Sequence, residues 1–135
     1  MLRAFLDPEA QVELGKDLAL LKAASAMIDI SDGLSVDLSH LVEESGYGAE
    51  IHKERLPVSS ELRALQKRAY DFALNGGEDY QLLFSVAPEK VKILSRLKKK
   101  YIITWIGKII REKRIDVIDR HSHRQKLLPR AWQHF

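Results

Sequence analysis

The stretch Ala26-Met27-Ile28-Asp29-Ile30-Ser31-Asp32-Gly33-Leu34 gives the strongest indication of the fold of this chain. An apolar run ends in two acids, a hydroxyl and a glycine, and a helical apolar pattern follows at Leu34, Leu38, Leu41 and Val42. This order predicts a buried strand over residues 25–30 and then a helix that runs to about residue 44. Ser31 is expected to cap that helix, with Asp32 in its first turn.

The same junction has two possible meanings. Asp and Ser are common capping residues and Gly is common in turns, so the run is compatible with an ordinary helix start. Carboxylates at a strand-to-helix junction can also bind a divalent cation, while N–H groups at the helix start can bind phosphate. Asp29 favours the second interpretation, because an acid that closes a buried strand has no capping task. Side chains alternate along a strand, so Asp29 and Ser31 are expected to point the same way.

A second unusual run, Asn75-Gly76-Gly77-Glu78-Asp79-Tyr80, lies where a helical segment gives way to a strand. Paired glycines permit a tight turn and a close approach of a ligand to the backbone. The adjacent acids Glu78 and Asp79 then enter an apolar strand, which is costly unless they meet a partner. A helix C-terminus followed by a charged loop is the alternative. The run favours a functional role, and together the two runs point to phosphate chemistry.

Around these runs, helical and strand patterns alternate. Helices are expected over 8–24, from Ser59 or Ser60 through Leu65, over 70–74 and from Pro88 to about Leu97. Strands are expected over 49–52, 80–86, 101–110 with a break at Gly107, and 115–118. The predicted fold class is α+β, with a mixed β-sheet covered by helices, in a single domain over residues 1–135.

The composition excludes several classes of protein. The chain has 135 residues, of which 45% are hydrophobic and 30% charged, as is usual for a globular domain. It has no apolar run of ~18 residues, so no membrane span is expected. It also has no cysteine, which fits a cytoplasmic location and excludes disulfides and thiolate metal sites. The net charge of +3 comes from basic residues late in the chain. We interpret these as a solvated surface, and no nucleic-acid partner is expected.

Two further features are ambiguous. His121 and His123 have a spacing that suits metal binding, but no third ligand is evident nearby. Trp132, near a polar C-terminus, could stack on a planar ligand or anchor the tail to the core, and the residues alone favour the anchor.

Taken together, these motifs resemble the C-terminal half of the thiamine-monophosphate kinase family, in the superfamily of aminoimidazole ribonucleotide synthetase. The resemblance covers nearly the whole chain. It rests on residues 28–34, on Ser45-Gly46-x-Gly48-Ala49, on Leu56-Pro57, on residues 76–84, on Ile106-Gly107 and on the closing aromatic-x-His-Phe of residues 132–135. The Gly-Gly-Glu-Asp-Tyr run and the aromatic tail are the more specific signals. Gln81 departs from the frequent Glu of the family.

The resemblance implies ATP-dependent phosphorylation of thiamine monophosphate to the diphosphate, with several Mg²⁺ ions. By position, Asp29 corresponds to a magnesium ligand and Asp32 to a ligand of a further magnesium ion. Ser31 corresponds to an ATP contact and Glu78 to a substrate contact. Trp132 matches the aromatic position that packs on the substrate, which reverses the preference drawn from the residues alone. Phosphoryl transfer depends on positioning and charge neutralisation, in agreement with these residue types.

One departure from the family bears on activity. The family enzyme has a preceding domain that supplies most metal ligands and much of the nucleotide site, and this N-terminal ATP and metal domain is absent here. We therefore expect the chain to be inactive alone and to need that domain or a partner chain, with a homodimer possible. The alternative is a stand-alone ligand-binding or interaction domain without catalysis. Another enzyme of the superfamily is disfavoured by the lack of cysteine and by the Trp-x-His-Phe ending.

Overall fold

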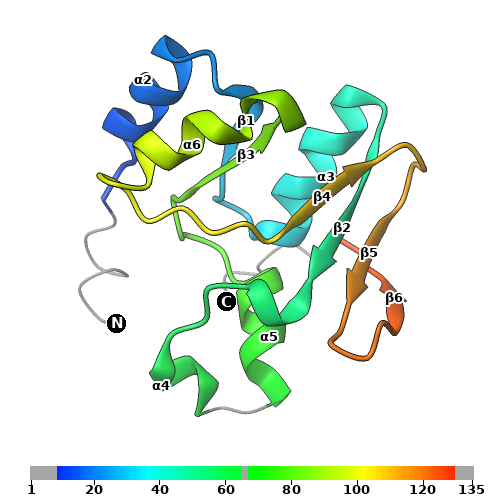
Figure 1. Ribbon diagram of the computed structural model, residues 1–135. Helices are drawn as coiled ribbons and strands as arrows, with labels where there is room; N and C mark the ends of the chain where they lie inside the picture. Colours follow the sequence, from blue (N-terminus) through cyan, green and yellow to red (C-terminus); the bar gives the residue numbers. More distant parts are fainter. Residues whose placement is uncertain (1–8, 65–66, 130–135) are drawn as a thin grey trace.

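Two β-sheets organise residues 9–64 and 67–129, which are the residues that the computed structural model describes (Figure 1). The first sheet is an antiparallel pair of β1 (Ala24–Asp29) and β3 (Leu82–Val86). The second has the strand order β4-β2-β5-β6, with bounds Gly107–Ile110, Gly48–His52, Ile115–Ile118 and Arg124–Lys126. Strands β2 and β5 are parallel, and the other pairs are antiparallel. The expected α+β class is confirmed, with the strands divided between two sheets.

The helices cover both sheets. Their bounds are α2 Val12–Leu20, α3 Leu34–Ser45, α4 Ser60–Arg63, α5 Lys67–Asn75 and α6 Val91–Leu97, with 3₁₀ turns at Lys53–Arg55 and Pro88–Lys90. Figure 1 shows α2 and α6 together over the β1–β3 pair, and α4 and α5 at the opposite end of the molecule. In the described part of the chain, every helix is too short or too polar to span a bilayer.

Two apolar clusters form the core. The larger one joins α3 and α5 to β2 and β5, and the inward side chains of β1 pack against it. Its buried members include Leu34, Leu38, Leu41, Ala49, Ile51, Leu56, Leu74, Ile115 and Val117, with Ala26 and Ile28 at its edge. The smaller cluster lies between α2 and α6 on the other face of the β1–β3 pair and contains Leu14, Leu18, Ala23 and Leu97. Side chains of the β1–β3 pair thus contribute to both clusters, while Ser25, Met27 and Asp29 of β1 stay exposed.

Helix ends were predicted with mixed success. Ser59 caps α4 as expected, because its hydroxyl accepts a hydrogen bond from the Leu62 N–H at 3.1 Å. Gly46 ends α3 in the left-handed conformation, with φ +71°. The expectation that Ser31 caps α3 is wrong. The helix begins at Leu34, its N-cap is Gly33, and no side chain caps it.

The strand expected from residue 101 begins only at Gly107. Residues 101–106 instead cross from α6 toward β4, and they form no strand pairing. Ile102 is 99% exposed on this crossing, so its apolar character does not mark burial. Strand β6 was not expected, because Arg124-Gln125-Lys126 is polar throughout and shows no alternation.

Two buried acids lie opposite each other on the second sheet. Glu50 of β2 and Asp116 of β5 are register partners, each 5% exposed. The Glu50 carboxylate pairs with Lys108 Nζ at 2.9 Å and with the Arg124 guanidinium. The Asp116 carboxylate pairs with Arg114 Nε at 2.7 Å. Through Lys108 and Arg124, these ion pairs link β4 and β6 to the central strand β2.

This network predicts an acid-sensitive contribution to stability. The Lys108 ammonium, and after it the Arg124 guanidinium, hold the pKa of Glu50 below its ordinary value of 4.5. A carboxyl with a lowered folded-state pKa stabilises the fold above its unfolded pKa, and this stabilisation is lost as the pH falls through the folded value. We expect Glu50→Gln to be less stable than the wild type at pH 7 and to lose less stability between pH 5 and pH 3, measured by urea unfolding. Glu44→Gln, at an exposed position, is the control, and parallel curves for Glu50→Gln and the wild type would contradict the prediction.

Candidate functional site

The two unusual runs of the sequence lie side by side. The pairing of β1 with β3 places Asp29 opposite Leu82, and backbone hydrogen bonds continue beyond the strand ends. The Ile30 N–H donates to the Gln81 carbonyl at 2.9 Å, and the Tyr80 N–H donates to the Ile30 carbonyl at 2.8 Å. The Glu78 N–H donates to the Ser31 carbonyl at 2.9 Å. Residues about fifty positions apart in the chain are thus held in one local unit.

A second set of contacts ties the start of α3 to the end of α5. The Ser35 hydroxyl, which is fully buried, donates to Asn75 Oδ1 at 2.8 Å. Asn75 Nδ2 in turn donates to Asp71 Oδ1 at 2.9 Å. A Cβ atom at Gly33 would lie 3.1 Å from both the carbonyl carbon and the oxygen of Asn75, and Gly33 has φ +115°. Glycine at this position allows the two runs to approach each other closely.

The loop between β1 and α3 has its backbone turned inward. The N–H groups of Ser31 and Asp32 both donate to Asp37 Oδ2, at 3.0 and 3.1 Å. Asp37 lies in α3 and is only 2% exposed. These two N–H groups precede α3, which begins at Leu34, and they are not available to phosphate because a carboxylate of the chain already accepts them.

The acidic side chains at the strand end face outward. Asp29 and Asp32 are exposed, while Ser31 and Glu78 are half-buried. Within residues 9–64 and 67–129, no hydrogen bond or ion pair engages the carboxylates of Asp29 and Asp32. Two unpaired carboxylates suit Mg²⁺, which binds one or two carboxylates together with water and phosphate oxygens. The described residues contain no group of three acidic or histidine ligands that could hold a metal ion, so such a site needs ligands from elsewhere.

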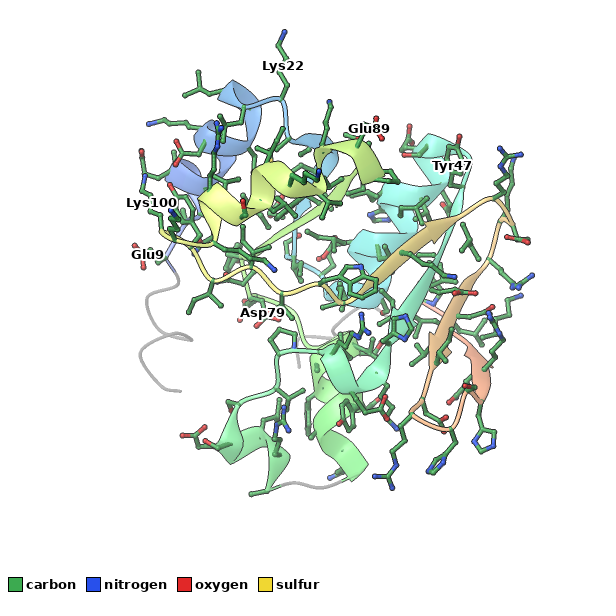
Figure 2. All side chains as sticks on the ribbon, viewed as in Figure 1. Glu9, Lys22, Tyr47, Asp79, Glu89 and Lys100 are labelled. Atoms are coloured by element: carbon green, nitrogen blue, oxygen red, sulfur yellow. The ribbon has the colours of Figure 1, made fainter. Side chains whose placement is uncertain are left out.

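The turn after Gly77 is strained. Glu78 and Tyr80 have φ +66° and +49°, a left-handed conformation that costs free energy for residues other than glycine. Between them, Asp79 reaches the surface, but the protein around it displaces water, and this partial burial raises the pKa of its carboxyl above the ordinary value of 3.8. Figure 2 shows Asp79 on the segment that connects α5 to β3, in the middle of the molecule.

The other candidate residues lie elsewhere or outside the described residues. His121 and His123 lie on the β5–β6 turn, where their N–H groups donate to Asp119 Oδ1 and His123 Nδ1 lies 3.1 Å from Asp119 Oδ2. Their arrangement is that of a stabilised turn. Trp132 lies outside the described residues. Asp37 was not singled out from the sequence, although an acid on the apolar side of α3, between Leu34 and Leu38, is a signal that could have identified it.

Comparisons with known proteins identify the family. Residues 4–120 match the model of the AIR synthase related protein, C-terminal domain. The chain belongs to this family. Among its relatives, the thiamine-monophosphate kinase of Haemophilus influenzae is 45% identical over 108 residues, which cover 77% of this chain and 32% of the relative. That of Aquifex aeolicus is 35% identical over 139 residues, which cover 100% of this chain and 41% of the relative. The resemblance seen in the sequence is confirmed.

Solved structures agree with this assignment. The structure of AaThiL complexed with AMPPCP and TMP is 35% identical, with a TM-score of 0.78, over 99% of this chain and 40% of that one. The thiamine-monophosphate kinase of Stenotrophomonas maltophilia K279a has a TM-score of 0.77 at 36% identity, over 85% of this chain and 37% of that one. The hydrogenase maturation protein HypE of E. coli, at 18% identity and a TM-score of 0.74, shares the fold. The chain spans 32% of the Haemophilus influenzae kinase, 41% of the Aquifex aeolicus kinase and 40% of the AaThiL structure.

The close approach at Gly33 predicts a specific loss of stability. Gly33→Ala introduces a Cβ atom into a conformation that alanine rarely adopts and pushes it against the Asn75 carbonyl group. Gly46→Ala is a matched control, because Gly46 also has a positive φ but meets no atom within 4 Å. We expect Gly46→Ala to cost about 1 kcal/mol and Gly33→Ala about 2–4 kcal/mol of unfolding free energy, measured by urea denaturation. Equal losses for the two variants would contradict the close contact.

Proposed function

We propose that this chain forms the C-terminal part of a kinase that phosphorylates thiamine monophosphate to thiamine diphosphate with ATP and Mg²⁺. The observation that supports this most is the junction of the two runs, which brings Asp29 and Asp32, whose carboxylates have no partner among the described residues, to the same end of the strands as Ser31 and Glu78. Similarity to the thiamine-monophosphate kinases supports the choice of reaction, as does the AaThiL complex with AMPPCP, an ATP analogue.

Each side chain has a proposed role. Asp29 and Asp32 would hold Mg²⁺, since their carboxylates are exposed and free of protein partners among the described residues. Bound Mg²⁺ would neutralise phosphate charge. We assign Ser31 to an ATP contact, Glu78 to a substrate contact and Trp132 to packing on the substrate. No nucleophile is required of the protein, because a phosphate oxygen of thiamine monophosphate can attack the terminal phosphorus of ATP directly, while the bond from that phosphorus to the bridging oxygen breaks and ADP leaves.

The contribution of this chain is therefore to position groups. The backbone pairs between residues 30–31 and 78–81 fix Ser31 and Glu78 relative to each other. Proximity and alignment of the two phosphates provide much of the rate enhancement in phosphoryl transfer, and electrostatic stabilisation provides the rest. Held this way, the carboxylates of Asp29 and Asp32 and the Glu78 side chain would face the two phosphorylated ligands from one side.

We propose that the rest of the active site comes from a preceding domain or from a partner chain. The described residues offer two carboxylates at the strand end and no group of three metal ligands, and the chain spans about two fifths of the Aquifex aeolicus kinase. On this proposal residues 1–135 form one domain, which is inactive alone, works in the cytoplasm where ATP is available, and can take part in a homodimer of the completed enzyme.

Reconstitution tests the proposal. The chain is mixed with the remaining N-terminal portion of the Haemophilus influenzae kinase, whose C-terminal part it resembles at 45% identity. Formation of thiamine diphosphate from thiamine monophosphate and ATP is followed by chromatography, with each part alone as a control. We expect activity only in the mixture and only with Mg²⁺. An inactive mixture of two folded parts that bind each other would contradict the kinase proposal, and binding of thiamine monophosphate by the chain alone would then favour a stand-alone binding domain.

Two variants divide the proposed roles in that mixture. Asp29→Asn should raise the Mg²⁺ concentration required for half-maximal activity by about tenfold or more, because a carboxylate ligand is lost. Trp132→Ala should raise the KM for thiamine monophosphate and leave the KM for ATP nearly unchanged. An unchanged Mg²⁺ requirement would remove Asp29 from the metal role, and equal rises in both KM values would make Trp132 a structural anchor.

A further inference from the structure

Asp37 occupies an unusual position for an acidic side chain. It lies in the first turns of α3, on the side of the helix that carries the buried residues Leu34, Leu38 and Leu41. At 2% exposure it has almost no contact with solvent. A buried carboxylate needs hydrogen-bond donors or a cation to offset its lost hydration. Among the described residues, Asp37 forms no ion pair with Lys, Arg or His.

Its partners are the backbone of the loop that carries the candidate site. Asp37 Oδ2 accepts the N–H groups of Ser31 and Asp32 at 3.0 and 3.1 Å. Both are short enough to be good hydrogen bonds, and bonds to a charged acceptor are stronger than those between neutral groups. The two peptide units that carry the Ser31 and Asp32 N–H groups are thereby fixed in direction. Asp29, before these units, and Asp32, within them, are both exposed.

We propose that Asp37 is a positioning residue of this site: its buried carboxylate holds the Ser31–Asp32 backbone so that the carboxylates of Asp29 and Asp32 are presented together to a divalent cation. This inference rests on the proposed function for the identity of the cation. It assigns to a residue remote from the ligand the task that outer partners of metal ligands perform in other proteins, where their loss weakens metal binding by about 10- to 100-fold.

A second consequence concerns how phosphate is bound. Since the Ser31 and Asp32 N–H groups are already used by Asp37, a nucleotide phosphate at this loop meets side chains and bound cation rather than these backbone donors. At Ser31 and Asp32 the loop therefore offers side chains, and not backbone donors, to a ligand.

Two NMR measurements on the ¹⁵N-labelled chain test the proposal: amide hydrogen exchange of the chain alone, and Mg²⁺ titration of the chain mixed with the N-terminal portion of the Haemophilus influenzae kinase, which supplies the remaining ligands. Asp37→Ala removes the acceptor, so exchange at the Ser31 and Asp32 amides should accelerate at least about tenfold, while amides in the second half of α3 keep their protection. The apparent Mg²⁺ affinity, read from the amide shifts of residues 29–33, should fall about tenfold or more. Asp37→Asn keeps an acceptor oxygen and should restore the slow exchange. Glu44→Gln, which removes one acid from an exposed position on the same helix, should leave both measurements unchanged.

The outcomes separate the two proposals. Unchanged exchange at Ser31 and Asp32 in a folded Asp37→Ala variant would overturn the role of Asp37. The same holds if the variant binds Mg²⁺ as tightly as the wild type. A wild-type chain that shows no response to Mg²⁺ in the mixture with the N-terminal portion would instead contradict the metal assignment within the proposed function, and the exchange data would still decide whether Asp37 holds the loop. A general loss of protection throughout Asp37→Ala would make Asp37 a residue of global stability and would contradict a local positioning role.

Discussion

The structure depends on the backbone pairing that continues from β1 and β3 into the loops beyond them. Asp29 and Leu82 are the last register partners of the two strands, and the hydrogen bonds at Ile30, Tyr80 and Glu78 extend the same ladder. Without this extension, the loop after β1 and the turn before β3 would have no fixed relation. With it, two segments rich in acids and glycine meet at one end of the β1–β3 pair.

The strained backbone at Glu78 and Tyr80 is held in place by hydrogen bonds to the neighbouring loop. Glu78 and Tyr80 adopt left-handed backbone conformations, which persist only where neighbouring structure determines them. Their own N–H groups donate across to Ser31 and Ile30. On the other side, Gly33 lets α3 begin directly against the end of α5. Strain of this kind commonly marks functional positions, and here it lies between the residues assigned to substrate and to metal in the proposed kinase.

Local patterns in the sequence predicted most elements but not how they come together. The apolar run before Asp29, the capping Ser59 and the left-handed Gly46 each leave a signal within a few residues, and the structure agrees with all three. The division into two sheets depends on register between distant strands, which no local pattern records. The Ser35–Asn75 hydrogen bond joins residues 40 positions apart, so no local sequence pattern predicts it either. The cap expected at Ser31 failed because α3 begins only at Leu34, so that Gly33 is the N-cap residue and Ser31 lies two residues before it.

The most direct test of this account is a double-mutant cycle between Ser35 and Asn75, the side chains that join the two runs. Unfolding free energies are measured for Ser35→Ala, Asn75→Ala and the double variant. The account predicts a coupling energy of about 1 kcal/mol, as expected for a buried hydrogen bond between neutral groups. Ser39→Ala combined with Asn75→Ala should show none, because the Ser39 hydroxyl donates to the Val36 carbonyl of its own helix. Additive effects of Ser35→Ala and Asn75→Ala would contradict the claim that this hydrogen bond holds the start of α3, next to the first run, against the second run at Asn75.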